Sequence, residues 1–157
     1  MAGEELFSWV ISSPTGEPTP ASNGVVVGAD GDPETLQNCR LVFACAGLNI
    51  KQYCTKDSLN VIRKLDRNGA IIGAICTGTY LMAAAGLLDD KRCTIHWENI
   101  DGLAEEFPLL EITNELFEID DTRITCSGGT ASLDMILYLI SQVHGTTLAA
   151  QVSEQFI

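Results

Sequence analysis

Cys76 is the residue best placed for chemistry in this 157-residue chain, because of the pattern around it. Residues 70–75 form a short apolar run, as expected of a strand buried on both faces of a parallel sheet. Thr77 and Gly78 follow without a polar loop, and good helix formers then continue to Gly86. A cysteine at such a strand-to-helix turn is typical of a nucleophile elbow. The positive end of the helix dipole predicts a thiol that ionises readily.

His96 is the candidate base for Cys76, because nucleophilic catalysis needs a base within hydrogen-bond reach. Its neighbours Trp97 and Glu98 fit a recognition corner equally well, since an aromatic face and a carboxylate together attract a cationic amine. Glu115 could supply that carboxylate instead. The alternatives are a structural histidine beside a tryptophan and a solvated acidic surface. Cys76 itself could be a nucleophile, line a ligand pocket or only pack.

Backbone N–H groups form a second set of candidate binding groups. Gly47 follows the apolar run 41–45, and with Thr77 and Gly78 it could form an oxyanion hole or an anion nest. Ser127 and Gly128 open a Ser-Gly-Gly-Thr sequence ahead of a long helix, where N–H groups could hold a carboxylate. The plain alternatives are glycines that permit tight turns and a sequence that only caps the helix.

Alternating strand and helix patterns must position these residues. We expect strands at 6–11, 24–28, 41–45, 70–75 and 93–95, and a hairpin of 116–119 with 123–126. Helices are expected after Asp32-Pro33, at 55–68, at 98–106, from 131 to Gly145, and from 147 to 157. The pattern predicts an α/β fold with a mostly parallel sheet covered on both faces, and ligands in such folds bind at the carboxyl ends of strands.

Two of the expected helices carry apolar stripes that should face the core. In helix 55–68 the stripe is Leu59, Ile62 and Leu65, with Thr55 as N-cap. In the long helix before Gly145 the expected inner face consists of Leu133, Ile136, Leu137 and Ile140.

Composition excludes several classes of protein. A formal charge of −12 would repel a phosphate backbone, so these residues are not expected to bind nucleic acid themselves. There is no apolar run long enough to span a membrane and no secretory signal, which predicts a cytoplasmic protein. The six cysteines show neither CxxC nor zinc spacing, so we expect no metal or cofactor. We expect five of the cysteines to be buried as small hydrophobic residues.

The segment 73–99, GAICTGTYLMAAAGLLDDKRCTIHWEN, resembles the elbow region of the PfpI/ThiJ-like, class I glutamine-amidotransferase-like superfamily. More narrowly, it resembles the N-terminal domain of AraC-type transcriptional regulators, in which a CTG[TA] elbow precedes THW or HWE by about twenty positions. Stretches 114–120, 125–134 and 152–157 resemble the same subgroup. The resemblance implies a flavodoxin-like three-layer sandwich with a cysteine elbow, and places His96 where superfamily enzymes have their partner histidine.

The chain departs from this subgroup at both ends. Relatives have an opening strand and helix ahead of Leu6, which supply an acidic residue beside the cysteine in the enzymes. The absent strand is central in the family's sheet. Its place must therefore be filled by a segment not assigned above as a strand, by a partner chain or by a rearrangement of the sheet. After Ile157 relatives continue into a double helix-turn-helix DNA-binding domain, which we expect beyond this single sensor domain, 1–157.

The resemblance therefore favours a ligand-sensing and dimerising domain of an AraC-type regulator over an enzyme. The implied effector is a small amine or amino-acid derivative of the betaine, carnitine or arginine class, bound beside Cys76 and His96. Implied partners are this effector, a second copy of the chain, and DNA only through the domain after residue 157. The alternative is a Cys–His hydrolase, amidase or glyoxalase-like enzyme with Cys76 as nucleophile.

Overall fold

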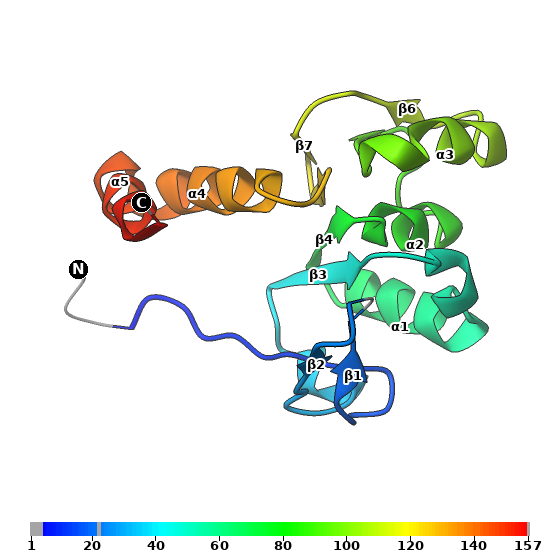
Figure 1. Ribbon diagram of the computed structural model, residues 1–157, viewed down its shortest axis with the longest axis horizontal. Coiled ribbons are helices and arrows are strands. Elements are labelled where there is room, and N and C mark those ends of the chain that lie inside the picture. The colour runs from blue at the N-terminus through cyan, green and yellow to red at the C-terminus, as the bar shows by residue number, and fades with distance from the viewer. Residues whose placement is uncertain (1–4, 22, 157) are drawn as a thin grey trace.

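The computed structural model describes residues 5–21 and 23–156, and a four-stranded sheet lies at its centre (Figure 1). Across the sheet the strands are β3 (Leu41–Ala46), β4 (Ile71–Cys76), β8 (Arg123–Cys126) and β7 (Phe117–Asp120). The first three run parallel, and β7 pairs antiparallel with β8 through the expected hairpin. The predicted α/β class with a mostly parallel sheet is therefore confirmed.

Alternate side chains of β4 point to two different layers of helices. Ile72 and Ala74 pack in a core formed with α1 (Lys56–Arg67) and α2 (Gly78–Ala84). Ile71 and Ile75 face the opposite side, where α4 (Ala131–His144) covers the sheet. This period of two is what a strand buried on both faces requires. The result is three layers, helices on sheet on helix.

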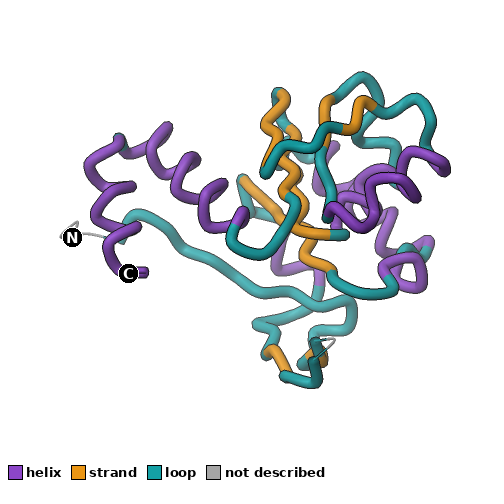
Figure 2. Tube along the Cα trace, turned by 45° about the horizontal axis from the view of Figure 1, so that its top comes forward, coloured by secondary structure: helices purple, strands orange, loops and turns teal. Residues whose placement is uncertain are grey.

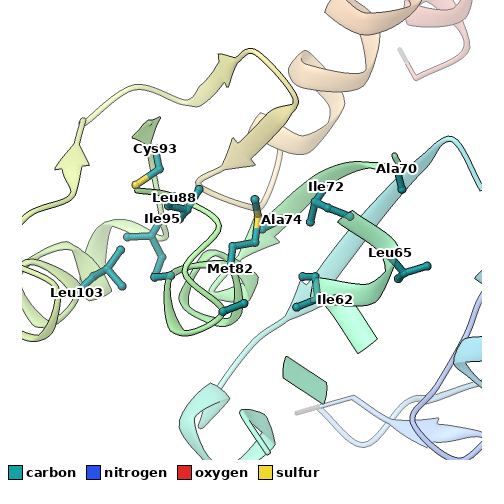
Figure 3. Packing of buried hydrophobic residues seen from close by; sticks show 12 residues of the cluster. Ile62, Leu65, Ala70, Ile72, Ala74, Met82, Leu88, Cys93, Ile95 and Leu103 are labelled. Atoms are coloured by element: carbon teal, nitrogen blue, oxygen red, sulfur yellow. The ribbon is translucent and has the colours of Figure 1, made fainter. Parts of the chain in front are cut away.

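The larger core lies under α1 and α2 and continues to α3 (Ile100–Glu106) (Figure 3). Ile72, Met82 and Leu88 are fully buried there, and Leu103 brings α3 into the same cluster. Burial contributes about 25 cal/mol per Å² of apolar area removed from water, so this core stabilises the packing of α1, α2 and α3 on the sheet.

Helix signals in the sequence explain where α1 begins and ends. The Thr55 hydroxyl accepts a hydrogen bond from the Ser58 N–H at 3.2 Å, as an N-cap should. Beyond the C-terminus Gly69 has a φ of +88°, which is the left-handed conformation that ends helices. Arg63 of this helix donates to the carbonyls of Ala84 and Ala85, so α1 also holds the C-terminus of α2.

The remaining elements are short and connect the three layers. They are β1 (Thr19–Pro20), β2 (Val26–Val27), η1 (Pro33–Leu36), η2 (Ile50–Tyr53), β5 (Arg92–Cys93), η3 (Trp97–Asn99), β6 (Glu111–Ile112), α5 (Thr146–Ser153) and η4 (Glu154–Phe156). β1 and β2 form a separate two-stranded sheet. β2 lies within the expected strand 24–28, whereas no strand was predicted at β1. β5 pairs with β6. Ile157, the expected last helical residue, lies outside the described residues.

The expected strand at 6–11 is wrong. This segment belongs to no strand, and its backbone ties are at Ile11, whose N–H donates to the Asp30 carboxylate and whose carbonyl accepts from the Asp30 N–H. It runs away from the sheet toward the C-terminal helices (Figure 2), where the Phe7 ring meets the His144 ring edge-on at 5.0 Å. Trp9 is 84% exposed. A strand needs a neighbour to satisfy its backbone groups, and among the described residues only Asp30 offers one, at Ile11.

Two burial predictions also need correction. In α4 the buried residues are Ala131 and Met135, whereas Ile136 of the expected inner face is exposed. Only the first turns of α4 cover the sheet, and the rest of the helix extends beyond it (Figure 1). β3 was expected to be buried but is half-exposed, because within the described residues it pairs only with β4 and its other edge is open.

The cysteines are less buried than their apolar neighbours suggested. Only Cys93 and Cys126 are fully buried, and Cys45 is exposed on the half-open strand β3. None of the described helices is long and apolar enough to cross a bilayer.

Candidate functional site

Cys76 lies at the turn between β4 and α2 with a φ of +60°. A non-glycine residue in this region is strained by about 1–3 kcal/mol and persists only when its surroundings hold it. One such restraint is the Thr77 hydroxyl, which donates to the Gly47 carbonyl at 2.5 Å. Another is Gly78, whose α-carbon packs so closely on Ala44 of β3 that no side chain fits. The predicted elbow thus brings Gly47, Thr77 and Gly78 together.

Gly128 closes the opposite side of the elbow. Its φ is +90°, and a β-carbon added there would lie 3.1 Å from the Cys76 sulfur. The neighbouring Ser127 hydroxyl donates to the Leu116 carbonyl, so it is engaged in holding the loop rather than in capping α4. Thr130, the residue before α4, also makes no side-chain cap. The loop after β8 therefore shields one face of the thiol.

Burial raises the pKa of the Cys76 thiol above its ordinary value. The hydrogen bond from the Thr77 backbone lowers the pKa and the nearby Cys126 raises it, but burial is the largest effect. The expected readily ionised thiol is therefore wrong. Burial has this effect because loss of hydration disfavours the charged thiolate.

We predict slow alkylation of Cys76 at neutral pH. A raised pKa means that the thiol stays protonated at pH 7.5 and that thiolate accumulates only as the pH rises through the raised value. Peptide mass spectrometry after iodoacetamide treatment should give a Cys76 rate below that of free cysteine, still increasing above pH 9. Unfolding in urea should abolish the difference. A rate that reaches its plateau below pH 7 would contradict this assignment.

His96, Trp97 and Glu98 form a corner of their own. The His96 Nδ1 accepts a hydrogen bond from the Glu98 N–H at 3.4 Å and lies 3.7 Å from the Glu98 carboxylate. The Trp97 ring is tilted against the imidazole at 5.8 Å and is 72% exposed. Between Cys76 and His96, both within the described part of the chain, there is no hydrogen bond. The geometry therefore does not assemble a Cys–His dyad.

A chain of buried threonines holds this corner relative to the elbow. The Thr79 hydroxyl of α2 donates to the Thr94 carbonyl at 2.8 Å, and the Thr94 N–H donates to the Thr125 hydroxyl at 2.9 Å. The Thr94 hydroxyl donates to the Glu115 carbonyl. Thr94 lies two residues before His96, so these bonds set the direction in which the chain leaves the core.

A pocket of about 470 Å³ opens on the Thr77 side of the elbow. Its lining comprises the segment 47–52, Thr77 and Tyr80 of the elbow unit, and Ile95, Asn99, Gly102 and Leu103. Of the candidate ligand residues, Gly47 and Thr77 line this pocket, and the lining does not include Cys76, Gly78, His96, Trp97, Glu98, Ser127 or Gly128.

Lys51 and Tyr80 line this pocket and both contact Glu106, which is not among the lining residues, and sequence reasoning missed this cluster. Lys51 forms an ion pair with Glu106, and its ammonium lies 5.3 Å from the centroid of the Tyr80 ring. The Tyr80 hydroxyl donates to the same carboxylate. Burial, followed by this contact with Glu106, raises the pKa of Tyr80 to about 12, and the Lys51 and Tyr80 hydrogen bonds lower the pKa of Glu106.

No group of three potential metal ligands exists among residues 5–21 and 23–156.

Residues 37–142 match the DJ-1/PfpI family, whose fold has a mostly parallel sheet flanked by helices, as seen here. The chain belongs to the DJ-1/PfpI family. Among members of known structure, an AraC family transcriptional regulator from Pseudomonas putida superposes with a TM-score of 0.88 at 24% identity, covering 99% of this chain and 84% of that one. That likeness shows the shared fold.

Transcriptional regulators are prominent among the DJ-1/PfpI relatives in sequence. The HTH-type transcriptional regulator CdhR of Pseudomonas aeruginosa is 50% identical over 153 residues, covering 98% of this chain and 46% of CdhR. The HTH-type transcriptional regulator GbdR of the same species is 38% identical over 157 residues, covering 100% of this chain and 43% of GbdR. The chain thus spans about half the length of these relatives, and is homologous to the N-terminal part of AraC-type regulators.

An enzyme is also similar, at lower identity. The isonitrile hydratase of Pseudomonas putida is 30% identical over 100 residues, which covers 64% of this chain and 43% of the hydratase. The regulators are more similar to this chain than this enzyme is.

Proposed function

We propose that this chain is the effector-binding and dimerising domain of an AraC-type transcriptional regulator. The observation that carries the proposal is the similarity to CdhR and GbdR, which extends over 98% and 100% of the chain. The unassembled Cys–His pair and the raised pKa of the Cys76 thiol support sensing rather than turnover. A helix-turn-helix domain after residue 157 would then bind DNA, consistent with the charge of −12 on this part.

The effector in this proposal is a small amine or amino-acid derivative of the betaine, carnitine or arginine class. A pocket of about 470 Å³ has the size of typical small-molecule sites. Its lining combines apolar side chains with a few polar groups, among them Asn49, Gln52 and Asn99. Regulation requires only that the ligand binds one of two states of the protein more tightly than the other.

Dimerisation is the second part of the proposal. Large apolar side chains are exposed on α4 and on the segment 6–11, whose Phe7 contacts His144 of α4. They include Trp9, Tyr138 and Val143. A monomer gains little by exposing such side chains together, whereas a second copy would bury them. Light scattering at micromolar concentration should report twice the chain mass of 16.9 kDa. A monomer mass throughout this range would contradict the dimer.

Thermal unfolding with and without ligand tests the sensor proposal. A ligand at 100 times its Kd stabilises the folded state by about 2.7 kcal/mol, which raises Tm by roughly 5–10 °C for a chain of this size. We expect glycine betaine, carnitine or arginine to do this. Cys76→Ala should keep the ligand response, because the pocket lining does not include this thiol.

The alternative is a cysteine-dependent hydrolase, amidase or glyoxalase-like enzyme. The strained Cys76 backbone and the similarity to an isonitrile hydratase favour it. Turnover of an amide or aldehyde substrate that disappears in Cys76→Ala would establish this alternative and overturn the sensor proposal. Ligand stabilisation without turnover supports the sensor.

A further inference from the structure

Beside the pocket lies a cation site that the chain itself occupies: Lys51 and Tyr80 line the pocket, and both contact Glu106, which is not among the lining residues. The Lys51 ammonium lies over the ring of Tyr80, 5.3 Å from its centroid, and is paired with the carboxylate of Glu106. An aromatic face together with a carboxylate is the arrangement that holds substituted ammonium groups. Tyr80 belongs to α2 and Glu106 ends α3, whereas Lys51 belongs to η2.

The Lys51 ammonium can be replaced by another cation at little cost in stability. The Lys51 side chain is 67% exposed and the Glu106 side chain 39%, and ion pairs at such positions contribute little to stability. In contrast, the receiving groups are anchored. The Tyr80 ring packs edge-on against Phe107 at 5.6 Å, and its hydroxyl donates to Glu106. Lys51 can therefore leave while the site keeps its shape.

We propose that Tyr80 and Glu106 bind the ammonium of a zwitterionic ligand, which displaces Lys51, and that the released Lys51 then pairs with the ligand's carboxylate. This inference rests on the proposed function, and it names the residues that select the effector. Lys51 acts as an internal competitor against cations and as the partner of the anionic group.

Charge balance is the reason for preferring a zwitterion to a simple amine. Lys51 and Glu106 neutralise each other, and Tyr80 remains a neutral donor because its pKa is raised to about 12. A simple cation that took the place of Lys51 would leave that ammonium unpaired beside a second positive charge. A zwitterion supplies a carboxylate at the same time, so the charge of the pocket stays balanced.

Glycine betaine and choline are the probes, because both carry a trimethylammonium and only glycine betaine carries a carboxylate. Isothermal titration of the chain should show glycine betaine binding at least tenfold more tightly than choline. In Lys51→Met the preference should vanish, since choline no longer competes with an ammonium and glycine betaine loses its partner. Glu106→Gln should weaken both probes at least tenfold. Lys56→Met, on the exposed start of α1, is the matched control and should change neither affinity.

Urea unfolding of each variant establishes that it is folded before binding is compared. If glycine betaine binds the native chain, Lys51→Met and Glu106→Gln equally well, this inference is overturned while the sensor proposal stands. If neither probe binds the native chain, titration of the Lys51→Met variant with choline tests the cation site. Choline binding to Lys51→Met that is lost on adding Glu106→Gln supports the cation site, and no choline binding to Lys51→Met overturns it.

Discussion

Replacing Gly78 by alanine is expected to lower the free energy of unfolding by about 3 kcal/mol or to prevent folding, at the upper end of the cost of overpacking. A β-carbon at this position would lie 2.0 Å from the Ala44 carbonyl oxygen and 2.9 Å from its carbonyl carbon. Both atoms belong to the backbone of β3, which is paired residue by residue with β4. Neither can move without breaking the sheet, so α2 must separate from β3. Urea unfolding followed by circular dichroism measures the change.

Gly102→Ala is the matched control for Gly78→Ala. Gly102 also lies in a helix, α3, but a β-carbon there would meet nothing within 4 Å. Alanine is favoured over glycine inside a helix by up to about 1 kcal/mol, so this variant should be as stable as the parent or more stable. If the two variants lost the same stability, close packing of the elbow on β3 would not be the reason for glycine at position 78.

Elements with strong local signals could be predicted from the sequence. The elbow followed from a short apolar run that meets a glycine and helix formers, and α1 followed from Thr55, its apolar stripe and Gly69. The hairpin of β7 and β8 needs only a short turn, in which Asp121 takes a φ of +58°. These signals concern residues close in sequence, so no knowledge of the rest of the fold is required.

Predictions that depended on distant partners failed. Segment 6–11 has the composition of a strand, but a strand exists only where another strand accepts its hydrogen bonds. α4 is apolar around most of its circumference, so its pattern does not identify the face that meets the sheet. The contacts show that this face contains Ala131 and Met135.

The same distinction separates the two parts of the candidate site. The backbone of the elbow, with Cys76, Thr77 and Gly78, follows from local sequence. The cluster at the pocket does not, because Lys51 and Glu106 are 55 residues apart and Tyr80 is 26 residues from Glu106. Tyr80 within the elbow helix is the one local signal, since an aromatic residue there must face either the core or the pocket.

Arg123→Met is expected to lower the free energy of unfolding by about 2 kcal/mol, because it leaves polar groups of two other elements without partners. The Arg123 guanidinium is 2.7 Å from the Asp66 carboxylate of α1 and donates to the Leu87 carbonyl at 2.8 Å. Its side chain is 12% exposed, and that of Asp66 is 26% exposed. Methionine would fill the space of the side chain but supply none of its donors. The partial hydration of Asp66 keeps the cost below the 3–5 kcal/mol of a fully buried pair.

Arg40→Met is the control, because Arg40 is exposed and, within the described residues, its side chain makes no hydrogen bond or ion pair. Its stability should change by less than about 0.5 kcal/mol, as for surface substitutions in general. Asp66→Asn should fall between the two, since it removes the charge while the Leu87 bond remains. Equal effects of Arg123→Met and Arg40→Met would show that loss of a positive charge, rather than of these contacts, determines the result. A larger effect of Arg123→Met instead shows that the guanidinium ties α1 and the segment after α2 to β8.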